Sequence, residues 1–363
     1  IRQYIKSCYP TTASSAERHI MMINQAITNI QETTYSKKDI VRLLKATHTE
    51  AHMLYETADR AREHYMGNAV YLRGIIEFSN YCKKDCLYCG IRKNNKTVTR
   101  YRMTEEEILE TCIKIEQAGQ TTVVLQSGED FYYTKEVLGD IIAKIKKQTN
   151  LAVTLSVGER DRETYAYWKE KGMDRYLLRF ETANQKLFTL CHPADSFEKR
   201  IDCLKTLRAL GTQVGSGFLI GIPQQTIEQL ADDILFCTQL DLDMIGIGPF
   251  IPHSKTPFGQ IKNAFDHDVF YKTVAIIRLL NNDAHIPSTT AFDAIEPNGR
   301  NLLLQRGANV FMPNATPKKY RIDYQLYPGK PCVDESGDDC AQCVGHRIAQ
   351  LGRTIGKDHG HSK

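Results

Sequence analysis

The sequence has no long apolar run, and no stretch of it approaches the roughly 20 residues that a membrane-spanning helix requires. It also has no block of like charge: 47 Lys and Arg residues against 43 Asp and Glu residues give a net charge of +4, spread along the chain. These absences argue against a membrane or a nucleic acid as its partner. The first residues, IRQYIKSCYP, have neither the apolar core of a signal peptide nor a transit signature. We therefore expect a cytoplasmic protein, although the initial Ile leaves open an organellar leader that was removed.

Cysteine, in contrast, is abundant, because the 363 residues include 11 of them, an odd number. Secreted scaffolds that depend on disulfides are small and rich in loops, and this chain is neither. We therefore predict that the cysteines bind metal in a reducing cytoplasm.

The hydrophobic pattern changes once along the chain. Residues 1–66 have apolar positions at helical spacing with Gly67 as a stop, which predicts a helical cap. Strands and helices then alternate, which predicts an α/β fold with a (β/α)8 barrel of the TIM type over 67–313, an open doubly wound sheet being the alternative. Residues 314–363 are loop-like and form a C-terminal closing segment that contains cysteines. The predicted strands are 70–78, 121–126, 151–157, 174–180, 212–221, 243–250, 286–292 and 308–313. The predicted helices of this region are 104–118, 134–149, 161–171, 184–210, 226–240, 266–282 and 298–306.

Three cysteines follow the first predicted strand directly, as Cys82-x3-Cys86-x2-Cys89. A structural zinc ion usually has four protein ligands, and the closest downstream cysteine, Cys112, falls inside a predicted helix. Three thiolates that hold a 4Fe–4S cluster leave one iron open to another ligand. We expect four nearby cations to lower the pKa values of the thiols: Lys83, Lys84, Arg92 and Lys93.

This cysteine spacing, with the aromatic Tyr88 before the last cysteine, resembles the signature of the radical S-adenosylmethionine (SAM) superfamily. The resemblance implies that the open iron chelates SAM and that SAM is cleaved reductively to a 5′-deoxyadenosyl radical. It also places QSGED at the methionyl amine, Glu181 at the ribose, Arg200 at the carboxylate and GFLIGIP near adenine. Without the resemblance, Glu181 and Arg200 are ordinary surface charges. The implied cofactor-binding residues are Tyr88, Gln126, Ser127, Gly128, Glu129, Ser156, Glu181, Arg200, Gly221 and Met244.

Segments such as IIEFSNYCKKDCLYCGIRKNNK, DRYLLRFETAN and YQLYPGK narrow the resemblance, over roughly residues 40–355, to the FeFe-hydrogenase maturase family HydE. Its relatives are biotin synthase and methylornithine synthase. The resemblance implies an enzyme that helps to build the two-iron subcluster from a cysteine-bound Fe(CO)2CN-type organometallic substrate. Implied partners are maturases of the HydG and HydF types and an electron donor such as ferredoxin or flavodoxin. The implied substrate residues, which barrel packing would otherwise explain, are Thr154, Arg179, Thr289, Thr290, Tyr324 and Tyr327.

A second set of three cysteines lies near the C-terminus, as Cys332-x7-Cys340-x2-Cys343. By the same resemblance it binds an auxiliary 2Fe–2S or 4Fe–4S cluster, and a structural zinc is the alternative. The other cysteines are interpreted as structural thiols, and three of them fall in or beside predicted helices, which disfavours sulfur insertion of the biotin synthase type. Two functions stay open beside the maturase: a carbon-skeleton mutase similar to methylornithine synthase, and a non-catalytic iron–sulfur scaffold or carrier. The structural thiols are Cys8, Cys112, Cys191, Cys203 and Cys237.

Overall fold

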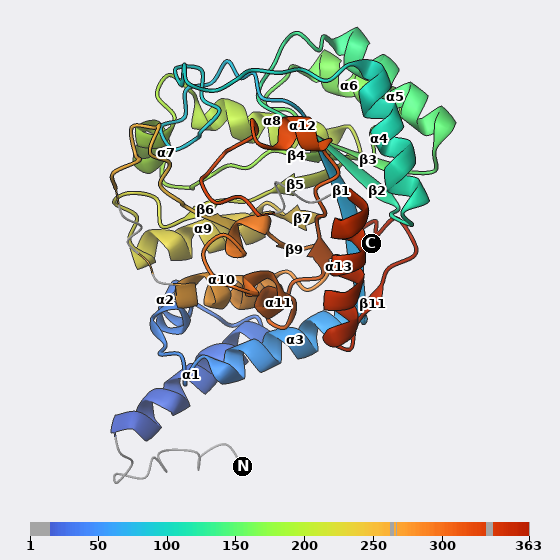
Figure 1. Ribbon diagram of the computed structural model, residues 1–363. Helices are drawn as coiled ribbons and strands as arrows, with labels where there is room; N and C mark the ends of the chain where they lie inside the picture. Colours follow the sequence, from blue (N-terminus) through green and yellow to red (C-terminus); the bar gives the residue numbers. More distant parts are fainter. Residues whose placement is uncertain (1–14, 262–264, 266, 332–336, 363) are drawn as a thin grey trace.

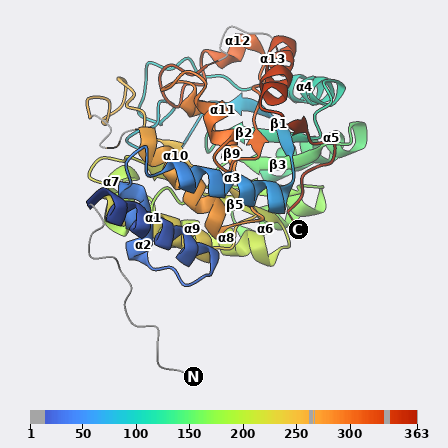
Figure 2. The same cartoon turned by 90° about the horizontal axis from the view of Figure 1, so that it is seen from below.

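Figure 1 shows the protein as a computed structural model, which describes residues 15–261, 265, 267–331 and 337–362. Its first described segment is helical, as predicted, with α1 (Ser15–Gln31), α2 (Lys37–Lys45) and α3 (His52–Met66). Ser36 caps α2, and its N–H and hydroxyl both donate to the Asp39 carboxylate. Gly67 ends α3 in a left-handed conformation with φ 70°. These helices pack outside the sheet, where α3 runs beside α10 (Figures 1 and 2).

Eight parallel strands form the centre of the molecule, in the order β7-β5-β4-β3-β2-β1-β10-β9. A parallel bridge between Met244 and His285 joins the two ends of this order, with hydrogen bonds from the Ile245 N–H to the His285 carbonyl (2.9 Å) and from the His285 N–H to the Asp243 carbonyl (2.9 Å). The circuit is therefore closed, which confirms the barrel and rules out the open sheet. The strands are β1 (Ala69–Ser79), β2 (Thr122–Ser127), β3 (Ala152–Ser156), β4 (Arg175–Leu177), β5 (Gln213–Ser216), β7 (Met244–Ile245), β9 (Pro287–Ser288) and β10 (Val310–Phe311).

Two predicted strands are each divided in two, because backbones meet closely at Gly217. A Cβ atom at Gly217, which has φ 153°, would lie 2.0 Å from the carbonyl oxygen of Gly246. The chain therefore bends there, and the short strands β6 (Leu219–Ile220) and β8 (Gly248–Pro249) pair with each other instead of extending β5 and β7.

Helices surround the barrel close to their predicted positions. Side-chain caps define several of their starts, as at Thr104 and Thr226, where the sequence pattern also indicates one. The predicted helix 184–210 is two helices, because Pro193 interrupts the chain and Ser196 caps a new start. The helices are α4 (Glu105–Gln117), α5 (Lys135–Gln148), α6 (Arg162–Glu170), α7 (Gln185–Cys191), α8 (Phe197–Ala209), α9 (Ile227–Gln239), α10 (His267–Leu280), η1 (Thr290–Phe292) and α11 (Gly299–Leu304).

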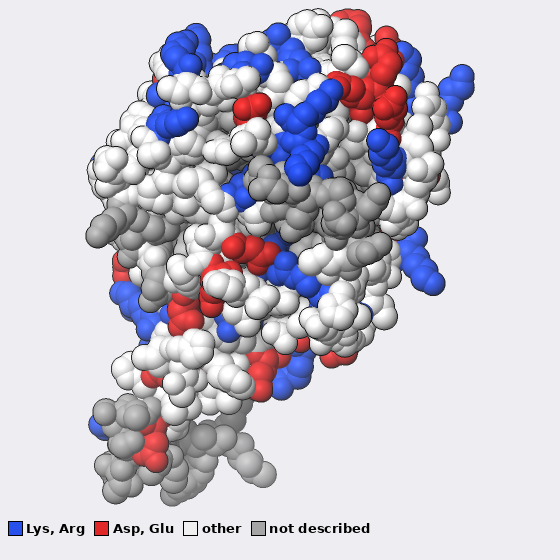
Figure 3. Space-filling view, in the orientation of Figure 1, with Lys and Arg blue, Asp and Glu red and all other residues white. Residues whose placement is uncertain are grey.

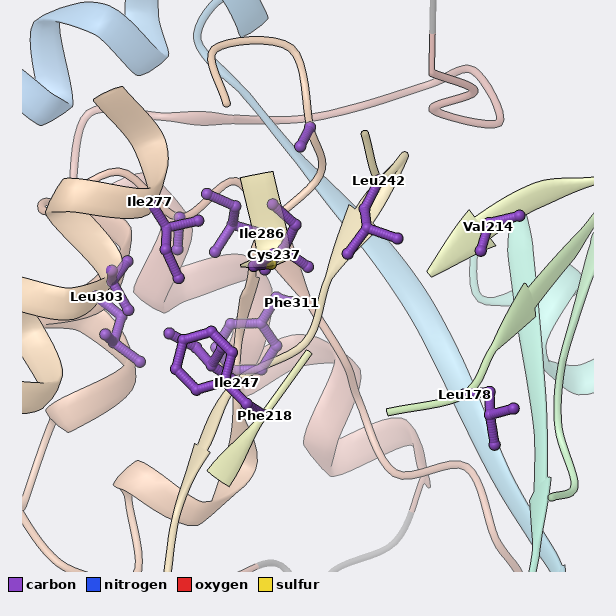
Figure 4. Close-up of a cluster of buried hydrophobic side chains, with 14 of the residues drawn as sticks. Leu178, Val214, Phe218, Cys237, Leu242, Ile247, Ile277, Ile286, Leu303 and Phe311 are labelled. Atoms are coloured by element: carbon purple, nitrogen blue, oxygen red, sulfur yellow. The ribbon is translucent and has the colours of Figure 1, made fainter. Parts of the chain in front are cut away.

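Apolar side chains fill the space between the strands and the outer helices. In Figure 4, Phe218, Ile247 and Phe311 face Leu303 and Ile277, and all five are buried. Burial of this apolar surface fixes the helices on the barrel. No helix in the described ranges combines the length and the apolar character that crossing a membrane demands.

The C-terminal segment is more ordered than its loop-like sequence predicts. It forms α12 (Lys318–Arg321), α13 (Gly337–Gln350) and β11 (Thr354–Ile355), which pairs with the start of β1. The tail then crosses the amino-terminal end of the barrel, where the Arg73 and Arg175 guanidinium groups donate to the carbonyls of Gly360 (3.2 Å) and His359 (2.6 Å). The amino end of the barrel is therefore covered, and the carboxyl end is the one available for a site. The division into cap, barrel and closing segment stays a prediction.

Candidate active site

The three cysteines Cys82, Cys86 and Cys89 lie on a loop at the carboxyl end of β1, and the Arg100 side chain organises this loop. Its guanidinium group donates to the carbonyl oxygens of Asn80, of Ile91 (2.8 Å), of Arg92 (2.7 Å) and of Asn95 (3.2 Å). These bonds fold residues 80–100 back on themselves. A local network therefore fixes the cysteines, without help from a disulfide.

All three cysteines are free and only partly accessible. The Sγ atom of Cys82 accepts a hydrogen bond from the backbone N–H of Glu129 (3.3 Å), and Sγ of Cys86 lies 3.2 Å from Nδ1 of His192. Burial raises the pKa of every thiol, and for Cys86 and Cys89 the charge of neighbouring thiolates adds to this effect, so that the pKa of Cys89 is about 12.

The prediction that nearby cations lower these pKa values was wrong, because carboxylates take up most of that charge. Lys83 pairs with Glu129 (3.0 Å), and Arg92 pairs with Asp85 (2.6 Å). Lys84 contacts two further carboxylates, those of Glu159 (3.1 Å) and Asp195 (2.6 Å).

The arrangement fits an iron–sulfur cluster. Soft thiolate ligands suit such clusters. A bound metal centre would offset both the repulsion between the thiolates and the cost of burying their negative charge. Among the described residues, the set of potential ligand atoms that lie within 4.8 Å of one another is not the three thiols but Cys86 with His192 and Asp195. Lys84 already occupies its carboxylate, so that set is less suited to an ion.

The loop after β2 packs directly on the cysteine loop. A Cβ atom at Gly128 would lie 2.2 Å from the carbonyl oxygen of Tyr81 and 2.7 Å from Cβ of Cys82. Only glycine permits this approach. The Glu129 carboxylate accepts a hydrogen bond from the Glu159 N–H (3.0 Å) in addition to its pairing with Lys83.

Further along the barrel mouth, buried polar atoms have no hydrogen-bond partner among the described residues. They belong to Glu181 (Oε2), Arg179 (Nε), Thr154 (Oγ1) and Thr289 (Oγ1). Oε2 of Glu181 lies 3.3 Å from Nη2 of Arg179, and Glu181 holds a left-handed backbone with φ 71°, a conformation that is uncommon and strained for non-glycine residues. Buried polar atoms are nearly always paired, so this group is suited to a polar ligand.

Comparison with known proteins identifies the family to which this chain belongs. A profile described as "Radical SAM superfamily" matches residues 76–237. The "[FeFe] hydrogenase maturase subunit HydE" of Thermotoga maritima is 52% identical over 310 residues, which cover 85% of this chain and 88% of that protein. The chain belongs to the HydE family of radical SAM enzymes.

Other relatives of this HydE-family chain share its architecture. The 3-methylornithine synthase of Methanosarcina acetivorans is 31% identical over 276 residues, which cover 75% of this chain and 77% of that protein. A crystal structure of methylornithine synthase (PylB) superposes with a TM-score of 0.80 at 27% identity and covers 91% of this chain and 97% of that chain. A structure of HydG, at 17% identity and a TM-score of 0.78, shows the same fold. Membership of the superfamily implies a 4Fe–4S cluster and SAM as cofactors.

Two predicted SAM residues of this HydE-family chain have other partners in the structure. Arg200 is buried and contacts Oε1 of Glu159 through both Nε and Nη2 (3.0 Å each). Burial opposes its charge, but the carboxylates of Glu159 and Glu181 outweigh burial and raise its pKa. The Arg73 guanidinium donates to Sδ of Met244 (2.8 Å) at the amino end of the barrel. We correct the assignment of Met244, because the cysteine loop lies at the opposite end.

The remaining predicted residues are found around the carboxyl end, and their roles stay predictions. The Gln126 amide donates to the hydroxyl of Tyr324 (3.2 Å), so a predicted cofactor residue contacts a predicted substrate residue. Ser127 donates to the carbonyl of Gly128 (2.6 Å), and the Gly221 N–H donates to Gln225 (2.7 Å). Three others are partly buried: Ser156 at the end of β3, Thr290 at the start of η1, and Tyr327.

The second cysteine set is described only in part. Cys332 lies outside the described residues, Cys340 falls on α13 without a described side chain, and Cys343 is exposed on the same helix. Residues three apart share one helix face, so α13 places two of the three positions together. The auxiliary cluster stays a prediction.

Sequence reasoning missed His192, Glu159 and Asp195, which surround the cysteine loop. Burial opposes the charge of Asp195, but the nearby His192 ring and a hydrogen bond from Lys84 (2.6 Å) outweigh it and lower the pKa of Asp195 to about 2. The sequence signal that could have found two of them is CHPADS, residues 191–196. There a proline interrupts a predicted helix directly after His192, which indicates a loop that bears His192 and Asp195.

Proposed function

We propose that this enzyme acts in the assembly of the two-iron subcluster of FeFe hydrogenase, on a cysteine-bound Fe(CO)2CN-type substrate. The observation that supports it most is the 52% identity to the Thermotoga maritima maturase subunit, because it extends over nearly the whole of both chains. The barrel mouth adds unpaired buried polar atoms suited to a polar ligand.

In this proposal Cys82, Cys86 and Cys89 hold the 4Fe–4S cluster. When bound, the cluster supplies the electron for reductive cleavage of SAM to a 5′-deoxyadenosyl radical. Gly128 lets the β2 loop lie against Cys82, and the Glu181 carboxylate, whose Oε2 lies 3.3 Å from Nη2 of Arg179, would accept hydrogen bonds from the ribose. Glu159 holds Arg200 through Nε and Nη2, and Nη1 of Arg200 donates to the Arg179 carbonyl (3.1 Å), so a contact with the SAM carboxylate would require part of this network to rearrange.

The substrate would lie deeper in the barrel, among donors that have no hydrogen-bond partner in the described part of the chain. Arg179 Nε, Thr154 Oγ1 and Thr289 Oγ1 are suited to donate to anionic cyanide and carboxylate groups. Tyr324 is 1% exposed, and its hydroxyl is fixed by Gln126. On the face in Figure 3, Lys and Arg side chains lie over the upper end together with a group of Asp and Glu side chains, so this end has mixed charge.

The proposed partners follow from the same role. Maturases of the HydG and HydF types would deliver and receive the iron complex, and ferredoxin or flavodoxin would supply the electron. Cys332, Cys340 and Cys343 would bind an auxiliary iron–sulfur cluster.

A mutase similar to methylornithine synthase is the second candidate, because the structural likeness to that enzyme has a TM-score of 0.80. Anaerobic reconstitution followed by dithionite and SAM tests the shared chemistry. The wild type should form 5′-deoxyadenosine, Cys86→Ala should form none, and the exposed Cys343→Ala should match the wild type. Absence of the product from wild type would leave only the scaffold or carrier.

Maturation of an apo-hydrogenase in vitro separates the two enzymes. With HydG- and HydF-type partners present, the wild type should restore hydrogen production and Cys86→Ala should not. Radical formation without any restored activity would favour the mutase.

A further inference from the structure

His192 lies between the cysteine loop and the barrel helices, and its side chain is 1% exposed. It follows α7, where its N–H donates to the Phe188 carbonyl (2.8 Å), and its ring stacks on that of Phe188, with centroids 4.7 Å apart. The neighbouring Cys191 carbonyl accepts a hydrogen bond from the Leu87 N–H (2.9 Å). The end of α7 is therefore fixed against the loop that bears the three thiols.

Both ring nitrogens of His192 have a partner on that loop. Nδ1 lies 3.2 Å from Sγ of Cys86, and Nε2 lies 3.1 Å from the hydroxyl oxygen of Tyr88. The nearest oxygen of Asp195 is 3.6 Å from Nδ1, and Lys84 holds the other oxygen of that carboxylate at 2.6 Å. The sulfur is therefore the closer partner of Nδ1.

The chemistry of a ligating cysteine decides the direction of these two hydrogen bonds. A thiolate bound to iron has no proton, so Nδ1 must carry the hydrogen and donate it to Sγ. In the neutral ring Nε2 then accepts, and the Tyr88 hydroxyl donates to it. The Tyr88 hydroxyl, which can donate or accept, thus donates to Nε2 and supports the tautomer that presents N–H to the sulfur.

We propose that His192 is a positioning residue that donates a hydrogen bond from Nδ1 to the thiolate of Cys86 and thereby raises the reduction potential of the cluster. The proposal rests on the cluster ligation in the proposed function and is independent of the substrate. Reduction adds negative charge to the cluster and its sulfurs, and a hydrogen bond to sulfur stabilises that charge. His192 therefore helps the cluster to accept one electron from its donor.

The test is a redox titration of the reconstituted protein, followed by the EPR signal of the reduced cluster. The second cysteine set is replaced by alanine in all samples, so that one cluster is observed. His192→Asn keeps an amide donor near the place of Nδ1, His192→Gln moves the amide toward the place of Nε2, and His192→Phe keeps only the stacking on Phe188.

The expected midpoint of His192→Asn is close to that of the unsubstituted protein. His192→Gln and His192→Phe should titrate at more negative potential, so that at the original midpoint the ratio of reduced to oxidised cluster falls about tenfold, which equals about 59 mV for one electron.

Three results would overturn the proposal: an unchanged midpoint in His192→Phe, equal shifts in His192→Asn and His192→Phe, or loss of iron uptake in all three variants. If only His192→Phe fails to take up iron, the midpoint potentials of His192→Asn and His192→Gln are compared instead, and equal midpoints would overturn the proposal. Failure of the proposed function looks different, because the parent protein itself would then lack a reducible cluster that depends on Cys86.

Discussion

A single methyl group at Gly128 tests whether the contact between the β2 loop and the cysteine loop determines cluster binding. In Gly128→Ala the new Cβ would lie 2.2 Å from the Tyr81 carbonyl oxygen, whereas ordinary van der Waals contact begins at 3.4 Å. The carbonyl must retreat by about 1.2 Å, and Cβ of Cys82, at 2.7 Å, by about 0.7 Å. Overpacking of this kind costs about 1–3 kcal/mol.

Displacement of Cys82 is the way in which the protein can relieve this strain. Metal–ligand distances vary by only about 0.2 Å, so a displaced Cys82 no longer binds well. If the strain of about 1–3 kcal/mol is relieved by moving Cys82, restoring its position in the cluster-bound form costs the same energy, which weakens cluster binding by about 5- to 150-fold. The assay is iron retained against a chelator after anaerobic reconstitution, in the background without the second cysteine set.

The matched control is Gly246→Ala, where the nearest atoms to a new Cβ are 3.7 and 3.9 Å away. That variant should retain iron as the parent does. Equal retention by Gly128→Ala and the parent would refute the view that this close approach holds Cys82 in place.

Three other changes test separate parts of the structure. Lys330→Met removes the ion-pair partner of the buried Glu77 carboxylate, which lies 2.5 Å away, and should lower the free energy of unfolding in chemical denaturation by about 3–5 kcal/mol. The control Lys319→Met removes an exposed partner of Glu107 and should lower it by under about 1 kcal/mol. Similar losses in the two variants would contradict this reasoning. Burial raises the pKa of Asp233 to about 7, above its ordinary 3.8, so its carboxyl stabilises the fold most below pH 3.8 and that contribution is lost as the pH rises to about 7. Relative to Asp233→Asn, the wild type should therefore lose up to about 4 kcal/mol between pH 4 and 7, and a constant difference would contradict the assignment. Joint replacement of Cys332, Cys340 and Cys343 by alanine should leave the formation of 5′-deoxyadenosine near the wild-type rate. A complete loss would show that the second cysteine set is needed for the chemistry.

Much of the fold was predictable, because alternating strands and amphipathic helices leave a local pattern. The starts at Thr104 and Thr226 depend on residues within one turn and lie where the sequence indicates them. The division of the strand at Gly217 was not predictable, because it depends on the backbone of Gly246 in the neighbouring strand. The order in the C-terminal segment depends in the same way on distant partners, such as Arg73 and Arg175.

The cations around the cysteine loop show why side-chain roles are harder to predict than elements. Lys83, Lys84 and Arg92 are adjacent to the thiols in sequence, which indicates a positive site, yet each contacts a carboxylate in the structure. Glu129 after β2, Glu159 after β3 and Asp85 in the loop itself offset this charge, and burial raises the thiol pKa values. Proximity in sequence alone therefore predicted that the thiol pKa values are lowered, whereas in the structure they are raised.

The sequence by itself identified the proposed ligands Cys82, Cys86 and Cys89, because all three lie on one short loop and their spacing does not depend on how the rest of the chain folds. It also determined the alternation of strands and helices, since strand and helix periods are local properties of the chain, whereas the bridge between Met244 and His285 decided that the sheet closes into a barrel. Only the tertiary structure decided that His192, 106 residues away, contacts Cys86, and that Arg200 pairs with Glu159. Closure of the barrel brings the ends of different strands together at one edge, and no pattern within a strand specifies which side chains meet there.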